Sequence, residues 1–250
     1  MKTMRCNIAV INLKVNRTAY NGADMDLKKL AKKPALFLRG EMDEKQLRKI
    51  FPQKLIHKKL PDAVEYRSMR SAYDQYIKDI SNKNMAVSWE TSCYMQGIAR
   101  ARHATKILDL GSGFSSYVFR EYAKKFNHNA VIHSVDDNEF WLEKTKSFLA
   151  GFDMPIDNLI ALPNFQKENK LKFDLIFHDL GNMTTRAQLL PLVLKVIEPN
   201  GLLILDDMHK KKYRVEANRE IKKAGLSIFS LRKYTLDEIG RFAAIALKVE

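Results

Sequence analysis

Short apolar segments alternate with amphipathic segments from about residue 104 onward, and this alternation restricts the possible folds more than any other feature. The apolar segments span residues 106–110, 130–135, 158–162, 173–179, 201–207, 226–231 and 242–249. Helical patterns separate most of them, near 115–126, 138–150, 184–198 and 211–224. Strands that alternate with helices of this length predict an α/β fold, a mostly parallel sheet with helices on both faces.

The connection between the last two predicted strands is short. It holds about ten residues, RKYTLDEIGR, which leaves no room for a crossover helix. The final pair is therefore expected to be antiparallel. The predicted sheet has seven strands, of which the last is antiparallel.

The first 87 residues follow a different pattern. Prolines at 34, 52 and 61 divide them into pieces that predict two short strands, over 6–15 and 34–40, and one helix over 62–80. A further helix over about 89–103 opens the alternating region. We expect a smaller N-terminal α+β region at 1–87 and a larger domain at 88–250.

The net charge of +14 is concentrated near the N-terminus, where residues 1–88 hold 19 Lys and Arg against 9 Asp and Glu. Such an excess fits an acidic partner, either nucleic acid or an anionic substrate, and equally a solvated lysine-rich surface. No apolar run approaches the roughly 18 residues of a membrane span. Two cysteines give neither a disulfide framework nor metal-type spacing, so we expect a cytoplasmic protein that does not bind membranes.

Polar residues cluster where the first predicted strand ends. They are Asp109, Gly111, Ser112, Gly113 and Ser115. Ligands of open α/β sheets bind at this edge, and the two glycines allow a close backbone approach. A pyrophosphate-binding loop would place a third glycine at position 116, which is a serine here. The loop therefore predicts either a nucleotide site without a pyrophosphate or a plain tight turn.

The second predicted strand ends on two aspartates. Asp136 lies 27 residues after Asp109, on a strand expected beside the first. A carboxylate there suits the cis-diol of an unphosphorylated ribose, because it accepts two O–H bonds. Asp137 and Asn138 follow at the start of the next helix, where Asp or Asn caps free N–H groups. We expect Asp137 to act mainly as this cap.

These motifs together resemble the class I S-adenosylmethionine-dependent methyltransferases. The matching stretches are ILDLGSG, VIHSVDD, FDLIFHD and IEPNGLLILDD, in the family's order and spacing. The resemblance implies a Rossmann-like fold for residues 88–250 and S-adenosylmethionine (SAM) as cofactor. It also implies that Asp109 anchors the loop or the cofactor's amino-acid end. Glu90, upstream, is expected to face the same cofactor, as are the residues of the loop and Asp137.

A finer resemblance points to the metal-dependent catechol and caffeoyl-CoA O-methyltransferases. The family's three metal ligands match Asp179, Asp206 and Asp207, and oxygen ligands of this kind suit Mg²⁺ or Mn²⁺. Such a cation would lower the pKa of a bound hydroxyl. The family's basic lysine is Asn182 here. His209 is the candidate replacement base, with a second role, that of a residue supporting the site or starting a helix, left open.

The leading hypothesis is O-methylation of a hydroxyl on a small or medium-sized substrate, with residues 1–87 capping the site and selecting the substrate. Two roles are open for Asp179, Asp206 and Asp207. They hold a cation that assists the reaction, or one of them bonds the substrate or a loop backbone. The alternative is a nucleic-acid methyltransferase, acting on RNA ribose or a base, whose basic N-terminal region grips phosphates. Base N-methylation is disfavoured, because HDLGN stands where an Asn/Asp-Pro-Pro-Tyr/Phe motif would be. A binding protein that has lost catalysis is a third hypothesis.

Overall fold

The computed structural model describes residues 43–248, except 54, 56 and 58–59. The strands predicted over 6–15 and 34–40 lie outside these residues. Residues 43–50 are helical, and two short 3₁₀ turns follow, η1 (Leu60–Asp62) and η2 (Val64–Tyr66).

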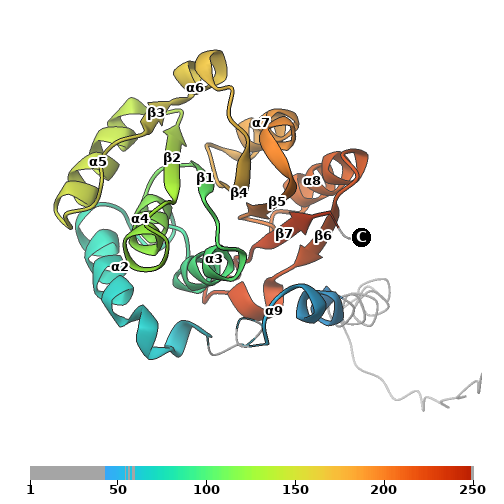
Figure 1. The fold of residues 1–250 in the computed structure, drawn as a ribbon, viewed down its shortest axis with the longest axis horizontal. Helices are drawn as coiled ribbons and strands as arrows, with labels where there is room; N and C mark the ends of the chain where they lie inside the picture. The colour runs from blue at the N-terminus through green and yellow to red at the C-terminus, as the bar shows by residue number, and fades with distance from the viewer. Residues whose placement is uncertain (1–42, 54, 56, 58–59, 249–250) are drawn as a thin grey trace, which may run out of the picture. The chain divides into compact units, whose positions relative to one another are not determined.

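A seven-stranded sheet forms the centre of the described chain, with strand order β3-β2-β1-β4-β5-β7-β6 (Figure 1). The parallel strands are β1 (Lys106–Leu110), β2 (Val131–Asp136), β3 (Leu159–Ala161), β4 (Phe173–His178) and β5 (Ile197–Leu205). β7 (Ala244–Leu247) runs antiparallel to both β5 and β6 (Ser227–Ser230). The predicted α/β architecture with an antiparallel last strand is confirmed.

Helices cover both faces of the sheet (Figure 1). One face carries α2 (Arg67–Asp79), α3 (Trp89–Arg102), α4 (Phe114–Phe126) and α5 (Glu139–Ala150). The other face carries α6 (Leu162–Glu168), α7 (Met183–Val196) and α8 (Lys211–Lys223). The connection between β6 and β7 holds only the short helix α9 (Arg232–Thr235), so it makes a hairpin-like return as its length predicts.

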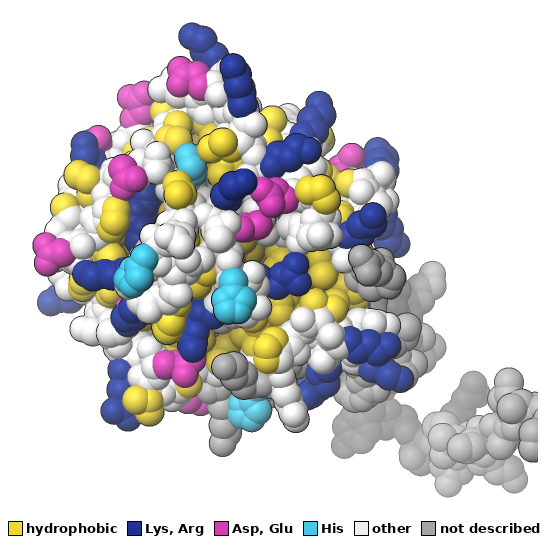
Figure 2. Space-filling view, viewed as in Figure 1, with side chains coloured by type: hydrophobic (Ala, Val, Ile, Leu, Met, Phe, Trp, Pro, Cys, Tyr) yellow, Lys and Arg dark blue, Asp and Glu magenta, His cyan; other side chains and the backbone are white. Residues whose placement is uncertain are grey.

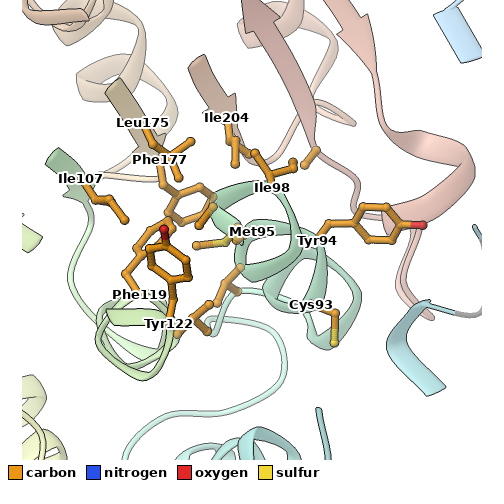
Figure 3. Packing of buried hydrophobic residues seen from close by; sticks show 14 of the residues in the cluster. Cys93, Tyr94, Met95, Ile98, Ile107, Phe119, Tyr122, Leu175, Phe177 and Ile204 are labelled. Atoms are coloured by element: carbon orange, nitrogen blue, oxygen red, sulfur yellow. The ribbon is translucent and has the colours of Figure 1, made fainter. Parts of the chain in front are cut away.

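Strand residues contribute to two separate hydrophobic clusters by alternation. Leu175 and Phe177 of β4 belong to the cluster under α3 and α4, whereas Ile176 belongs to the cluster under α7 and α8. Figure 3 shows Met95 and Ile98 of α3 directed at the first of these surfaces. The strands read as continuously apolar because both of their faces are buried.

The described part of the N-terminal region shares this core. Leu47 and Phe51 are buried in the same cluster as the sheet residues. On α2, the buried side chains Met69, Tyr73 and Tyr76 are spaced as one helical face. Residues 43–87 are therefore packed onto the larger domain, which places α2 beside α4.

Membrane-spanning helices were sought throughout the described segments. None of the helices there is both long and apolar enough to cross a bilayer.

The central strand β4 yields a stability prediction. Phe177 is 0% exposed, so Phe177→Ala should lower the free energy of unfolding by about 3–5 kcal/mol through lost burial and a residual cavity. Val215→Ala on α8, where the side chain is 61% exposed, serves as the control and should stay within about 0.5 kcal/mol. Urea titration followed by circular dichroism measures both. A loss below about 1 kcal/mol for Phe177→Ala would contradict this packing.

Candidate active site

The carboxyl ends of β1, β2, β4 and β5 meet at one edge of the sheet, because these strands are parallel neighbours. The residues that follow the four strands are the ones singled out in the sequence. Topology therefore brings most of the predicted site residues to the same edge, where open α/β sheets bind ligands.

The turn after β1 passes against the end of β4. Gly111 has φ +102°, and a Cβ built on it would lie 2.8 Å from the backbone carbon of Asp179. The amide of Asp179 in turn donates to the carbonyl of Leu110 at 2.7 Å. Only glycine fits this approach, so Gly111 is needed to join the two strand ends.

Asp109 anchors the loop of residues 111–116, the glycine loop. Its carboxylate is completely buried and accepts a 2.6 Å hydrogen bond from Ser116 Oγ, and Ser116 Oγ accepts from the amide of Gly113. Ser115 Oγ donates to the carbonyl of Gly111. Of the two roles predicted for Asp109, these contacts support loop anchoring. The serine that replaces a third glycine is thus part of the anchor.

The electrostatic state of Asp109 is unusual. Burial raises the pKa of Asp109 to about 6, and the hydrogen bond from Ser116 only partly opposes this. Its second oxygen, Oδ1, is buried without a hydrogen-bond partner. An ionised Asp109 is therefore held at a cost in free energy.

Asp136, at the end of β2, is hydrogen-bonded to the same loop. Its Oδ2 accepts from the amide of Ser112 at 2.7 Å and from Ser112 Oγ at 3.0 Å, and its Oδ1 accepts from the amide of Asn138 at 2.9 Å. Burial raises the pKa of Asp136 to about 6. Of about four acceptor positions on a carboxylate, one remains for a ligand. The arrangement offers one hydrogen bond to a ribose hydroxyl where two were expected.

The helix cap after β2 differs from the prediction. The N-cap of α5 is Asn138, whose Oδ1 accepts from the amide of Trp141, so the capping role assigned to Asp137 is wrong. Asp137 is exposed and reaches across to the loop after β4, where a Cβ on Gly181 would lie 2.9 Å from its Oδ2. This position places its carboxylate beside the loop that follows β4.

A buried arginine lies among the acids that follow β4 and β5. The Nη1 atom of Arg186 is 2.7 Å from Asp179 Oδ1 and 3.1 Å from Asp207 Oδ2. Its Nη2 atom donates to the carbonyls of Asp179 and Gly181, at 2.7 and 3.1 Å. Arg186 is only 4% exposed. Its guanidinium joins the two strand ends through two ion pairs.

This arrangement does not fit the divalent cation that was predicted at Asp179, Asp206 and Asp207. Two of the three carboxylates are paired with the guanidinium, and Asp206 Oδ1 accepts from the amide of Asp207 at 2.7 Å. Within residues 43–248, gaps excepted, no group of three or more His, Cys, Asp or Glu is placed to hold a metal. The three acids are neighbours at the edge, but they do not form a ligand set.

Burial dominates the ionisation of these acids. It raises the pKa of Asp206 to about 6, with the charge of Asp207 adding to the effect. It also raises the pKa of Asp179, against the opposing charge of Arg186. Both carboxyl groups therefore ionise at higher pH than an exposed aspartate does, and the charge of Arg186 favours their ionised forms.

His209 lies beside this group, as expected for a candidate base. Its Nδ1 is 3.3 Å from Asp207 Oδ1, a close contact that lacks the alignment of a hydrogen bond. Burial lowers the pKa of His209, and Asp207 opposes the shift. The imidazole is therefore neutral at pH 7 and able to accept a proton.

Two other polar residues of this region have structural roles. Asn182, in the place of the family's lysine, is the N-cap of α7 and accepts from the amides of Thr184 and Thr185. His178 is fully buried, with Nε2 2.8 Å from the carbonyl of Arg186, and burial lowers its pKa to about 4. Neither residue is placed to exchange a proton with a substrate.

Arg241 lies near the acids that follow β4 and β5, and Glu90 lies near Asp237. Glu90 lies in the first turn of α3, half-buried, and burial raises its pKa, with the charge of Asp237 adding. Arg241 pairs with Asp237 at 2.7 Å and donates to the carbonyls of Lys83 and Ala86, each at 2.8 Å. It thereby fastens the segment before α3 to the loop before β7.

Three residues in contact with the site were not found from the sequence. Arg186 had a usable signal, because a cation in the first turn of a helix opposes the helix dipole and needs acidic partners. Trp141 Nε1 donates to the carbonyl of Ser112 at 2.6 Å, and Tyr76 approaches Gly113 so closely that a Cβ there would lie 2.8 Å from its Oη. Both contacts join segments that are distant in the sequence, so no local sequence pattern predicts them.

Comparison with known proteins shows the family to which the chain belongs. A family model described as "Methyltransferase domain" matches residues 101–234, which is more than half of the chain. The chain therefore belongs to this methyltransferase family, and its resemblance to class I methyltransferases is confirmed. No curated protein matches its sequence.

Solved structures share the fold at low sequence identity. The O-methyltransferase TomG from Streptomyces achromogenes, involved in tomaymycin synthesis and solved with SAM, is 16% identical with TM-score 0.55, over 74% of this chain and 90% of TomG. An O-methyltransferase from Bacillus cereus, solved with SAH, is 16% identical with TM-score 0.57, over 72% and 91%. A putative O-methyltransferase from Klebsiella pneumoniae is 16% identical with TM-score 0.53, over 85% and 98%.

The raised pKa of Asp109 predicts a pH-dependent stability. Because the folded pKa of about 6 exceeds the unfolded value, the stability that protonated Asp109 contributes is complete below about pH 4 and lost as pH rises through 6. Asp109→Asn cannot ionise, so its free energy of unfolding relative to wild type should rise by about 2–3 kcal/mol between pH 4 and 8. Denaturant titrations across this range measure it.

The exposed Asp153 provides the control for this pH series. Asp153→Asn, an exposed change in the loop after α5, should stay within about 0.5 kcal/mol of wild type. A difference between Asp109→Asn and wild type that stays constant from pH 4 to 8 would show that Asp109 is not destabilised by its burial.

Proposed function

We propose that this protein transfers the methyl group of SAM to a hydroxyl group of a small or medium-sized molecule. The observation that carries the proposal is the shared edge of the sheet. The loop held by Asp109 and Asp136 follows β1 and β2, and the base candidate His209 follows β5 on the same edge. Cofactor and base would then lie on either side of one reacting hydroxyl.

The residues of the loop fit a nucleoside cofactor without a pyrophosphate. Ser112 fixes the Asp136 carboxylate and leaves one acceptor position on Oδ1 for a ribose hydroxyl. Gly111 and Gly113 would bring backbone close to the ligand, with Ser115, Asp137 and Glu90 beside it. The SAM and SAH held by the TomG and Bacillus cereus structures support this choice.

Proton removal is assigned to His209. The bound SAM supplies an activated methyl group on its sulfonium. A hydroxyl near His209 would give its proton to the neutral imidazole, and its oxygen would bond to the methyl carbon while the carbon–sulfur bond breaks, leaving SAH. Asp207 stabilises the imidazolium that forms, because its carboxylate is 3.3 Å away. Asp179 is not assigned as a base. Its Oδ1 lies 2.7 Å from Arg186 Nη1, so its role is to position that guanidinium.

Acceptor selection is assigned to the region before residue 88. Arg241 holds the segment at Lys83–Ala86 beside the loop that carries Asp237, close to His209. On the face that Figure 2 shows, Lys and Arg side chains are interspersed with acids and not gathered into a stripe. TomG is involved in the synthesis of tomaymycin, a likeness that favours a small-molecule acceptor over nucleic acid. A cytoplasmic location stays a prediction.

Cofactor binding provides the first test. Wild-type protein should bind SAM with a calorimetric Kd in the micromolar range, and Asp136→Asn should weaken binding at least about tenfold, since an amide is a poorer acceptor for a ribose hydroxyl and one buried contact is lost. Asp153→Asn, an exposed aspartate elsewhere, should leave the Kd unchanged. If wild-type protein shows no heat of SAM binding, the proposed function is wrong.

The base is tested by methyl transfer to a panel of phenols and aliphatic alcohols, with SAH release as the readout. His209→Asn should lower kcat at least about 10²-fold while the Kd for SAM changes less than twofold, because the imidazole acts on the acceptor only. Lys212→Gln, an exposed change on α8, is the control. Unchanged turnover in His209→Asn would remove His209 from the mechanism.

A further inference from the structure

The three acids after β4 and β5 require a positive charge at their centre if all of them are to be ionised together. Asp206 and Asp207 are consecutive, and Asp179 follows the neighbouring strand, so topology alone holds three carboxylates at one place. Like charges this close repel each other strongly in a partly buried setting. Protonation, a bound cation or a positively charged side chain can relieve this repulsion, and only the last two keep all three carboxylates ionised.

We propose that the guanidinium of Arg186 permanently takes the place of a divalent cation at this edge. It contacts Asp179 Oδ1 and Asp207 Oδ2 through one nitrogen, at 2.7 and 3.1 Å. Two backbone carbonyls receive hydrogen bonds from the other terminal nitrogen, at 2.7 and 3.1 Å. Four oxygens from the ends of two strands therefore surround one positive group, as oxygen ligands would surround a metal.

The position of Arg186 is built into the fold. Its side chain is 4% exposed, its guanidinium lies 5.8 Å from the ring centroid of Tyr213, and its backbone carbonyl contacts the buried His178. The residue stands in the first turn of α7, where the helix dipole disfavours a cation. The acids offset this effect, so arginine and acids depend on one another.

The same contacts exclude a metal ion. Mg²⁺ requires oxygen ligands at about 2.0–2.1 Å, and the carboxylate oxygens of Asp179 and Asp207 that face the centre are taken by Arg186. Entry of a cation would force the guanidinium out of a buried place and away from two carbonyl acceptors. Neutralisation of the acids by Arg186 does not depend on the proposed role of His209.

Manganese binding tests the inference without an acceptor or turnover. In titrations followed by electron paramagnetic resonance, wild-type protein should show no saturable Mn²⁺ binding up to 1 mM, a range chosen to cover about −4 kcal/mol of affinity. Arg186→Met, which keeps the bulk and removes the charge, should gain one site that binds at least tenfold more tightly than 1 mM. Arg186→Met combined with Asp179→Asn should lose that site again.

Thermal unfolding gives a second readout. Arg186→Met leaves two carboxylates unpaired and should have a lower Tm than wild type, and Mn²⁺ should raise the Tm of this variant only. Arg186→Lys is the matched control, because it keeps the positive charge and should remain unresponsive to Mn²⁺.

Two results would overturn the inference. One is a stoichiometric Mn²⁺ site in wild-type protein that Asp179→Asn abolishes. The other is a folded Arg186→Met variant, verified by circular dichroism, that binds Mn²⁺ no better than wild type. If Arg186→Met does not fold, the wild-type titration and Arg186→Lys still decide the question. Failure of SAM binding would reject the proposed function and leave this inference intact.

Discussion

The ion pairs of Arg186 join the ends of β4 and β5, and the rest of the site depends on this connection. Asp179 follows β4, Asp207 follows β5, and Arg186 belongs to the helix between them, so one guanidinium sets the spacing of two strand ends. His209 lies beside Asp207, with its Nδ1 3.3 Å from Asp207 Oδ1. Because the group is buried, loss of a single partner leaves an uncompensated charge, which typically costs about 3–5 kcal/mol. The ion pairs that stabilise the edge thus also hold Asp207, the acid beside His209.

The glycine loop shows the same principle in a different form. Asp109 and Asp136 are both held at the ends of buried strands, where burial raises their pKa values to about 6, and both are occupied by hydroxyl or amide donors of the loop. Burial of these carboxylates lowers the stability of the fold, whereas their hydrogen bonds fix the backbone of the loop. Such preorganised and dehydrated polar groups are what a binding site needs, and they are common at functional edges.

Much of the fold was predictable because the signals are local. Strands buried on both faces appear as unbroken apolar runs, and their polar ends mark the edge at which ligands bind. Contacts between distant segments were not predictable. The metal prediction for Asp179, Asp206 and Asp207 took three neighbouring acids for a ligand set. Arg186, in the first turn of a helix, signals a need for acidic partners, but which acids it contacts is not known before the sheet is placed. The helix cap moved by one residue, from Asp137 to Asn138, since either side chain satisfies the local chemistry.

The hydrogen bonds of Arg241 have a consequence for how the sequence of the segment before α3 can vary. This arginine grips the segment before α3 through the backbone carbonyls of Lys83, Asn84 and Ala86. Backbone acceptors are present whatever the side chains are. The segment before α3 can therefore exchange its side chains while its path stays fixed. Substitutions there would change the surface of this segment and leave the sheet and the glycine loop untouched.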